Sequence, residues 1–283
     1  MKRSTGVLQA GDRVQLTDEK GKIYSFFLTS GSQWHSHKGW INHDELIGKF
    51  EGSVIESSNG TKYQLMRPLL LDYQLSMPRG ATIIYPKDCA LIVGFADIFP
   101  GAKVLEAGAG SGALSISLLR AIGESGELHS FEVREDFLSI AQTNVRDFFG
   151  ENPSNWFTNN SLVQDGKFKE DFDRVIFDML APWDALDSAE RALKPGGVLC
   201  CYVATTTQLS RIAEAIKESG SFSEPESLET LLRYWHHEGL AVRPQHNMNA
   251  HTGFLTFARK MSEPPIKRRR RPAKGAATGQ ESN

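Results

Sequence analysis

The sequence has few cysteines and no long apolar run. Its 283 residues include three cysteines, and two of them, Cys200 and Cys201, are adjacent in an apolar segment. An odd number argues against a disulfide framework and predicts buried thiols in a reducing compartment, so we expect a cytoplasmic protein. No apolar run approaches the roughly 20 residues of a membrane span. The N-terminus also lacks the apolar segment of a signal peptide, so we expect no membrane partner.

The chain also lacks a net positive charge, although 23% of its residues are charged and the formal net charge is −2. Six Lys and Arg residues stand against one acid in residues 264–283, whereas the preceding residues keep 26 of the 32 basic and 33 of the 34 acidic residues. The composition of the tail predicts disorder. An acidic body does not favour nucleic-acid binding, so any RNA contact would depend on local patches or on this tail.

The order of the elements predicts an α/β protein with a small β module in front. Residues 7–66 contain two predicted hairpins, and the second turns at Asn59-Gly60, a pair typical of a type I′ turn. From residue 103 strand and helix patterns alternate, which predicts a parallel sheet with helices on both faces. We therefore predict a β-rich domain at 1–66, a helical linker and substrate-side loop at 67–102, a main domain at 103–262 and a basic tail at 263–283.

A glycine-rich segment is the strongest local motif. Apolar residues lead into Glu106, Gly108, Gly110 and Gly112 follow, and an amphipathic helical pattern begins at Ala113. This order predicts a strand, a tight turn and a helix whose free N–H groups favour an anionic part of a ligand. The segment also matches the permissive dinucleotide fingerprint. The acid favours S-adenosylmethionine instead, because a carboxylate attracts the ammonium and sulfonium of that cofactor and repels a pyrophosphate.

Four predicted strands end on acidic residues. Ligands of open α/β sheets bind beyond the carboxyl ends of strands, so we expect these acids at one rim. The second acid lies twenty residues beyond Gly112, a distance at which a carboxylate can take both ribose hydroxyls of an adenosine cofactor. The third and fourth strands are predicted at residues 161–165 and 173–178. In chain order the acids are Glu106, Glu132, Asp165 and Asp178.

Histidines and one tyrosine are weaker candidates. His35 and His37 could bind a metal, but no further ligand cluster lies near them in sequence, so we expect an exposed loop and no metal site. Tyr85 precedes a proline and is therefore held extended, which allows its ring to project from a fixed loop. Packing between modules is an equally good interpretation of this tyrosine. Near the C-terminus, residues 228–235 and 253–259 are predicted to close the sheet as an antiparallel pair.

Several of these segments together resemble the class I S-adenosylmethionine-dependent methyltransferases. More closely, they resemble the bacterial and archaeal tRNA (adenine-N1)-methyltransferases that modify the T-loop. The resemblance covers about residues 8–261, and the glycine turn marks only the superfamily. Where many members carry Asp-Leu-Met-Glu-Pro-Trp, this chain has alanine in place of the glutamate, so any role of that glutamate is absent. The more specific segments are Arg67-Pro68, 84–88, 177–183 and 251–254.

The resemblance implies a Rossmann-like, mostly parallel sheet with an antiparallel last strand, and a homotetramer. It places Asp178 beside the target base and Tyr85 near it. It also assigns the ribose to Glu132 and the adenine amino group to Asp165. The residues that we expect to contact the cofactor are Glu106, Gly108, Gly110, Ser111, Gly112, Ala113, Glu132, Val133, Asp165 and Asp178.

The expected reaction is methylation of adenine N1 in the T-arm of tRNA. N1 has an in-plane lone pair, so the reaction needs alignment and support for the positive charge that develops on the base. Asp178 would accept a hydrogen bond from the exocyclic amine, and Tyr85 would stack on the swung-out base. Three alternatives remain: a methyltransferase acting on a protein or small molecule, a non-catalytic tRNA-binding subunit, and a nicotinamide dehydrogenase.

Overall fold

The computed structural model describes residues 6–266, and the chain divides into two compact units, Met1–Leu162 and Val163–Asn283. Most of the predicted basic tail, residues 267–283, lies outside the described residues. The predicted domain boundaries after residues 66, 102 and 262 stay predictions.

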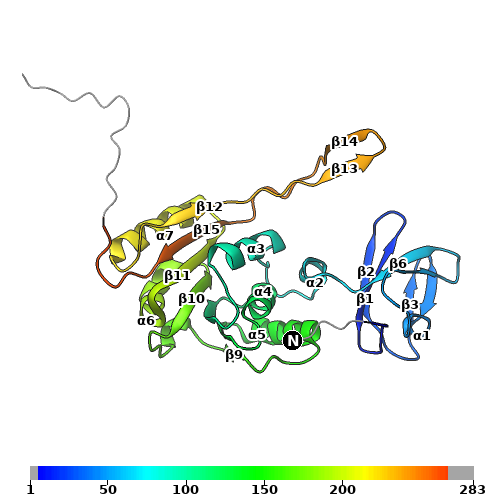
Figure 1. Cartoon of the computed structure of the whole chain (residues 1–283), viewed down its shortest axis with the longest axis horizontal. Helices are drawn as coiled ribbons and strands as arrows, with labels where there is room; N and C mark the ends of the chain where they lie inside the picture. The colour runs from blue at the N-terminus through cyan, green and yellow to red at the C-terminus, as the bar shows by residue number, and fades with distance from the viewer. Residues whose placement is uncertain (1–5, 267–283) are drawn as a thin grey trace, which may run out of the picture. The chain divides into compact units, whose positions relative to one another are not determined.

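The first unit begins with a small antiparallel module (Figure 1). Its four-stranded sheet has the order β2-β1-β6-β5, and a separate hairpin, β3–β4, precedes a short helix. Alternating burial along β6 places Tyr63 and Leu65 in the core of the module. The elements are β1 (Arg13–Asp18), β2 (Ile23–Phe27), β3 (Gln33–Ser36), β4 (Gly39–Asn42), α1 (His43–Leu46), β5 (Ser53–Glu56) and β6 (Lys62–Met66).

Both predicted hairpins of the module are present as β1–β2 and β5–β6. The predicted type I′ turn is wrong, because that turn needs a positive φ at both central residues. Gly60 has φ 79°, but Asn59 does not lie in the positive region. His35 lies on β3 rather than in a loop, and both His35 and His37 are exposed.

Arg67, which follows β6, binds the segment that precedes β1. Its side chain is buried and donates to the carbonyls of Gly6 and Val7, each at 3.2 Å, and to the carboxylate of Asp12 at 2.7 Å. A buried guanidinium requires such partners, because each unpaired donor would carry a desolvation penalty. The sequence motif Arg67-Pro68 therefore has a structural function at this point.

The rest of the first unit contains three parallel strands, in the order β7-β8-β9, and the helices between them. The predicted helix after the glycine turn is present as α4, which begins at Ala113. The predicted strand at 161–165 is wrong: the strand is β9, whose aromatic and β-branched residues fit the sheet. The elements are α2 (Leu70–Ser76), α3 (Pro86–Phe95), β7 (Lys103–Ala107), α4 (Ala113–Ile122), β8 (Glu127–Phe131), α5 (Glu135–Phe149) and β9 (Trp156–Asn159).

The second unit contains four further strands of a sheet, in the order β12-β15-β11-β10. β10 and β11 are parallel, whereas β15 is antiparallel to both β11 and β12, as predicted for the last strand. The elements are η1 (Val163–Asp165), β10 (Phe172–Asp178), η2 (Pro182–Ala185), α6 (Leu186–Ala192), β11 (Leu193–Val203), α7 (Thr206–Ser219), β12 (Glu226–Leu228), β13 (Trp235–Glu238), β14 (Ala241–Pro244) and β15 (Phe254–Arg259).

The predicted closing pair at the C-terminal end is only partly right. Of the strand predicted at 228–235, only Leu228 belongs to the partner of β15. The chain then continues into a hairpin, β13–β14, joined to β12 and β15 by long connections (Figure 1). The sequence analysis did not predict this hairpin, because most of its side chains are exposed and its residues do not alternate between apolar and polar.

Candidate cofactor and catalytic site

The three glycines of the turn after β7 adopt backbone conformations that other residues rarely take. Gly108, Gly110 and Gly112 have φ values of 89°, 53° and 84°. A Cβ on Gly112 would lie 3.2 Å from the backbone of Ala141 on α5, so this glycine also permits close packing. At Gly110 the nearest atom to such a Cβ is 3.9 Å away. The turn is therefore tight on the side of α5 and open at Gly110, where a ligand can approach the main chain.

Glu132 holds the turn from the end of β8. Its two carboxylate oxygens accept the amide N–H groups of Gly110, at 2.9 Å, and Arg134, at 3.0 Å. The amides of Gly108 and Ala109 donate to the carbonyl of Phe131, the residue before it. A carboxylate can accept about four hydrogen bonds, so two remain for further donors such as ribose hydroxyls. Glu132 thus lies where the sequence predicted it, next to the glycine turn.

Glu106 lies inside the protein rather than on its surface. Its side chain is fully buried, and its Oε2 accepts from the hydroxyls of Ser115 at 2.7 Å and Ser130 at 2.5 Å. The indole N–H of Trp156 donates in turn to the Ser130 hydroxyl. Burial raises the pKa of Glu106 to about 7, although the two serine hydrogen bonds act in the opposite direction. The serines and the tryptophan were not found by the sequence analysis.

The second oxygen of Glu106 bears on the nature of the ligand. Glu106 Oε1 is buried and has no hydrogen-bond partner among the described residues. A buried carboxylate with a spare oxygen, below a turn that is open at Gly110, fits a ligand with a cationic group and would repel a pyrophosphate. The donor set therefore fits S-adenosylmethionine better than a nicotinamide dinucleotide.

Ser111 and Val133, both expected to contact the cofactor, have different environments. The Ser111 hydroxyl accepts the amides of Gly80 and Ala81, at 3.1 and 3.4 Å, so its oxygen already holds the linker between α2 and α3. Val133 is 57% exposed and follows Glu132 directly. Ala113, the first residue of α4, is buried. Ser111 thus belongs to the turn and also to the anchorage of the linker.

Tyr85 stands at the beginning of α3. Its backbone is extended, with φ −65° and ψ 150°, as expected for the residue before a proline. Its carbonyl accepts the amides of Asp88 and Cys89, and its side chain is half-buried. Behind it, Lys87 and the buried Asp88 form an ion pair at 2.7 Å. The tyrosine therefore comes from a rigid helix start.

The second unit carries the other two acids. Asp178 is the last residue of β10, is half-buried, and is in register with Tyr202 of β11. Asp165 is exposed and ends the single turn η1 instead of a strand. Asp178 therefore ends a strand, as predicted. Asp165 does not, because no strand forms at residues 161–165.

The family-specific segments of the second unit surround the end of β11. The Tyr202 hydroxyl donates to the carbonyl of Thr252 at 2.6 Å, and His251 Nε2 lies 2.8 Å from the carbonyl of Ala204. A Cβ on Gly253 would lie 2.3 Å from the Tyr202 ring, which explains why glycine is needed there. The loop 251–254 is therefore fixed to the strand next to Asp178.

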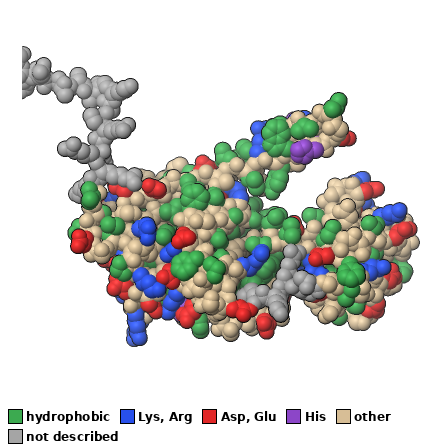
Figure 2. All heavy atoms as spheres, in the orientation of Figure 1, with side chains coloured by type: hydrophobic (Ala, Val, Ile, Leu, Met, Phe, Trp, Pro, Cys, Tyr) green, Lys and Arg blue, Asp and Glu red, His purple; other side chains and the backbone are tan. Residues whose placement is uncertain are grey.

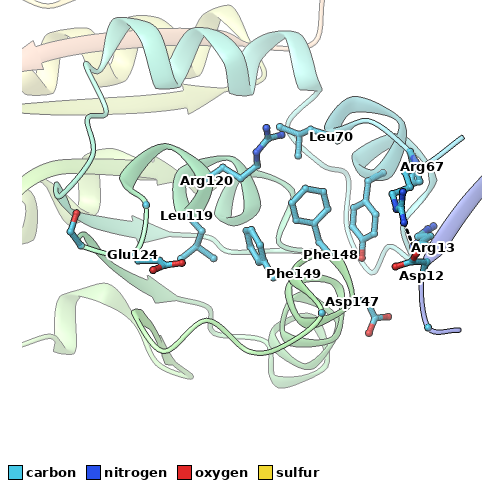
Figure 3. A pocket seen from close by; sticks show the side chains of 16 residues that line it. Asp12, Arg13, Arg67, Leu70, Leu119, Arg120, Glu124, Asp147, Phe148 and Phe149 are labelled. Carbon is cyan, nitrogen blue, oxygen red and sulfur yellow. Dashed lines mark hydrogen bonds and ion pairs between the residues drawn. The ribbon is translucent and has the colours of Figure 1, made fainter. Parts of the chain in front are cut away.

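The first unit also has a cavity of about 680 Å³ that none of the glycine-turn residues line. It lies among the start of α2 and the ends of α4 and α5, and Figure 3 shows Arg67 paired with Asp12 at its edge. Arginine side chains and carboxylates line it in equal number, so its charge selects neither anions nor cations. Its charged residues are Asp12, Arg13, Arg67, Arg120, Glu124 and Asp147.

The described residues, 6–266, offer neither a metal site nor a membrane-spanning helix. Within this range no group of three or more His, Cys, Asp or Glu side chains is placed to hold a metal ion. No helix in the same range combines the length and apolar character needed to cross a bilayer. None of the three cysteines forms a disulfide, and all three are buried, as predicted.

Comparison with known proteins identifies the family. The family model described as the tRNA methyltransferase complex GCD14 subunit matches residues 65–240, and the model of the TrmI-like N-terminal region matches residues 6–55. The tRNA (adenine(58)-N(1))-methyltransferase TrmI of Thermus thermophilus is 36% identical over 251 residues, which cover 87% of this chain and 95% of that protein.

Two solved methyltransferase structures have a similar fold. The tRNA (m1A58) methyltransferase TrmI of Aquifex aeolicus has a TM-score of 0.80 at 29% identity, covering 90% of this chain and 99% of that one. A SAM-dependent O-methyltransferase of Thermotoga maritima has a TM-score of 0.85 at 30% identity, covering 93% and 97%. The fold predicted from the sequence is thereby confirmed. The chain belongs to the TrmI/GCD14 family of tRNA methyltransferases, within the class I S-adenosylmethionine-dependent superfamily.

Proposed function

We propose that this protein transfers a methyl group from S-adenosylmethionine to N1 of an adenine in the T-loop of tRNA. The observation that carries the proposal is the 36% identity, over 87% of the chain, to a methyltransferase named for this reaction. The fixed glycine turn and its two carboxylates support it, because a non-catalytic subunit would not need to keep them.

The first unit would hold the cofactor through its glycine turn. S-adenosylmethionine supplies, when bound, an electrophilic methyl group. Gly108, Gly110 and Gly112 would accept the methionine end, and Glu132 would take the ribose hydroxyls with the lone pairs that its two backbone donors leave free. Glu106 would balance the cationic end through its spare oxygen. Ser111, Ala113 and Val133 stay proposed contacts, as does Asp165 for the adenine amino group.

Asp178 and Tyr85 would bind the target base. N1 lies on the pairing edge of adenine, so the base must leave its contacts in the T-loop before it can react. Asp178 would accept a hydrogen bond from the exocyclic amine, and this bond strengthens as positive charge develops on the ring, which lowers the barrier. Tyr85 would stack on the base, an interaction that contributes roughly 1–3 kcal/mol. Neither role requires a residue to take a proton before transfer.

The proposal is tested with an unmodified tRNA transcript. The full-length protein is incubated with the transcript and labelled S-adenosylmethionine, and the RNA is digested to nucleosides for mass spectrometry. We expect 1-methyladenosine from the transcript and none from a control transcript in which the T-loop adenines are replaced by uridine. Label in co-purified proteins or small molecules, with none in the RNA, would contradict the proposal and favour a methyltransferase of another substrate class.

We also propose that the protein is a homotetramer and works in the cytoplasm. The hairpin β13–β14 and its connections expose large apolar side chains, visible in green in Figure 2, and such a surface favours association with another copy. Three free buried thiols are typical of a reducing compartment. Light scattering tests the first point: we expect about four times the 31.4 kDa of one chain, and a monomer for a variant lacking residues 233–246. A monomeric full-length protein would refute it.

A further inference from the structure

Asn144, on the inner face of α5, joins two segments that are far apart in sequence. Its side chain is 1% exposed, and its Nδ2 donates to the carbonyl of Pro78 and to the carbonyl of Ser111, both at 2.9 Å. Pro78 belongs to the linker between α2 and α3, whereas Ser111 belongs to the glycine turn. One amide group therefore holds the linker and the turn together.

A second set of contacts joins the same two segments. The Ser111 hydroxyl accepts the amides of Gly80 and Ala81, at 3.1 and 3.4 Å. A Cβ on Gly80 would lie 2.6 Å from the Phe137 ring and 2.9 Å from Ile140, so the linker packs closely on α5. The linker cannot shift along α5 without breaking these contacts, and a movement of the turn at Ser111 is transmitted to it directly.

The start of the linker is also anchored through α2. Gln74, 1% exposed, donates to the carbonyl of Ala113 at 2.7 Å and to the hydroxyl of Ser117 at 2.8 Å, both on α4. The Tyr73 hydroxyl donates to the backbone carbonyl of Asn144 at 2.7 Å. The first half of the segment 77–85 is thus held by α2, Asn144 and Ser111, and four residues after Ala81 the segment ends at Tyr85.

We propose that Asn144 is a positioning residue that couples the glycine turn to the segment 77–85, so that cofactor and tRNA bind cooperatively. A ligand that orders the turn orders Ser111, and through Asn144 it orders the segment that presents Tyr85. Once one ligand has ordered the turn and the segment, the other ligand binds more tightly because it no longer has to order them. The effect is the same whichever of cofactor and tRNA binds first. The tRNA part of this inference rests on the proposed function.

The chemistry of the amide defines the variants. Asn144→Asp keeps the shape but replaces both N–H donors with an oxygen that faces two carbonyls, and Asn144→Ala removes the donors without repulsion. Asn155→Asp is a matched control. Asn155 Nδ2 also donates to two carbonyls, those of Gly123 and Gly126, at 2.8 and 2.7 Å, but these lie after α4, at the end away from the glycine turn.

The experiment measures the affinity for a tRNA transcript with and without S-adenosylhomocysteine, and thermal unfolding for each variant. In the wild type and in Asn155→Asp we expect S-adenosylhomocysteine to raise tRNA affinity by about fivefold or more, as in typical coupled sites. In both Asn144 variants we expect the ratio to fall close to one, while each ligand alone still binds. An unchanged ratio in a folded Asn144 variant, or the same loss in Asn155→Asp, would overturn the proposal.

A measurement on the wild type decides the case if the Asn144 variants do not fold. In hydrogen–deuterium exchange, S-adenosylhomocysteine should protect the amides of Gly80 and Ala81 together with those of the glycine turn, and leave the turn at Gly123 unchanged. Lack of protection at residues 78–85 would refute the coupling. This measurement needs no RNA, so it separates the coupling from the proposed function, which fails instead if the wild-type protein neither binds nor methylates tRNA.

Discussion

The buried carboxyl of Glu106 makes the stability of the protein depend on pH in a defined direction. Burial disfavours the charged form of Glu106 and raises its pKa from 4.5, the value of an exposed carboxyl, to about 7. Between these values the folded chain keeps a proton that the unfolded chain has released. The contribution of Glu106 to the free energy of unfolding is therefore fully present below pH 4.5 and is lost as the pH rises through 7. The total loss is about 3 kcal/mol.

Glu106→Gln tests this reasoning. The amide oxygen can still accept from Ser115 and Ser130, but the variant cannot ionise. The free energy of unfolding of the variant, minus that of the wild type, should thus rise by about 3 kcal/mol between pH 4.5 and 8. Urea unfolding at several pH values gives this difference, and other titrating groups cancel in it. A difference that does not change with pH would refute the assignment.

A control comes from Glu127, the first residue of the neighbouring strand β8. His129 and Lys103 hold the pKa of Glu127 below its usual value, and its side chain is 47% exposed. Its stabilising contribution is present above the usual pKa and is lost as the pH falls. For Glu127→Gln, the free energy of unfolding of the variant minus that of the wild type should therefore fall as the pH rises, and by a smaller amount than it rises for Glu106→Gln. The same direction in both variants would mean that a general effect of charge removal, and not burial, is responsible.

Three further predictions concern the base, the turn and the module. Asp178→Ala should leave S-adenosylhomocysteine binding intact but slow single-turnover methylation roughly a hundredfold, as for loss of an oriented polar group, and an unchanged rate would remove its role. Gly112→Ala should unfold at lower urea than Gly150→Ala: both replace a glycine in the left-handed region, costing about 1–2 kcal/mol, but only the Cβ at position 112 also meets Ala141. Equal midpoints would contradict the packing argument. Arg67→Met should cost roughly 3 kcal/mol, since it removes the cation that pairs with Asp12 and the donor to two carbonyls, whereas a loss as small as the roughly 0–1 kcal/mol of a surface pair would show that the ion pair is dispensable.

The fold could be predicted where the pattern reflects burial. The alternation of strands and helices after residue 103, and the acid-ended strand of β10, come from cores that select apolar residues at regular spacing. The prediction failed at residues 161–165, because the strand is formed instead by Trp156 to Asn159, and at β13–β14, which was not predicted. In both places the strand is short and half-exposed, so several registers of the sequence satisfy the pattern equally well.

The site could be predicted as a set of residue types but not as a network. The glycines and the acids are separated by sequence spacings that are typical of a cofactor site at the ends of strands. Ser130 and Asn144 do not, because a serine within a strand and an asparagine within a helix have no recognisable spacing to Glu106 or Ser111. Their roles depend on which carbonyl or carboxylate lies within about 3 Å, and only the folded chain brings those groups together.

The four acids that look equivalent in sequence are separated by their environments. Glu106 is fully buried and has one oxygen without a hydrogen-bond partner among the described residues, whereas each oxygen of Glu132 accepts one backbone amide, from Gly110 of the glycine turn and from Arg134. Asp165 is exposed on a single helical turn, so its orientation is the least constrained, whereas Asp178 ends a central strand. Catalysis gains most from a group whose position costs no reorganisation. This ranks Asp178 above Asp165 as the residue whose loss slows methyl transfer. Asp165→Ala should therefore reduce cofactor affinity and leave the rate at saturating cofactor unchanged, and the opposite pattern would reverse the two roles.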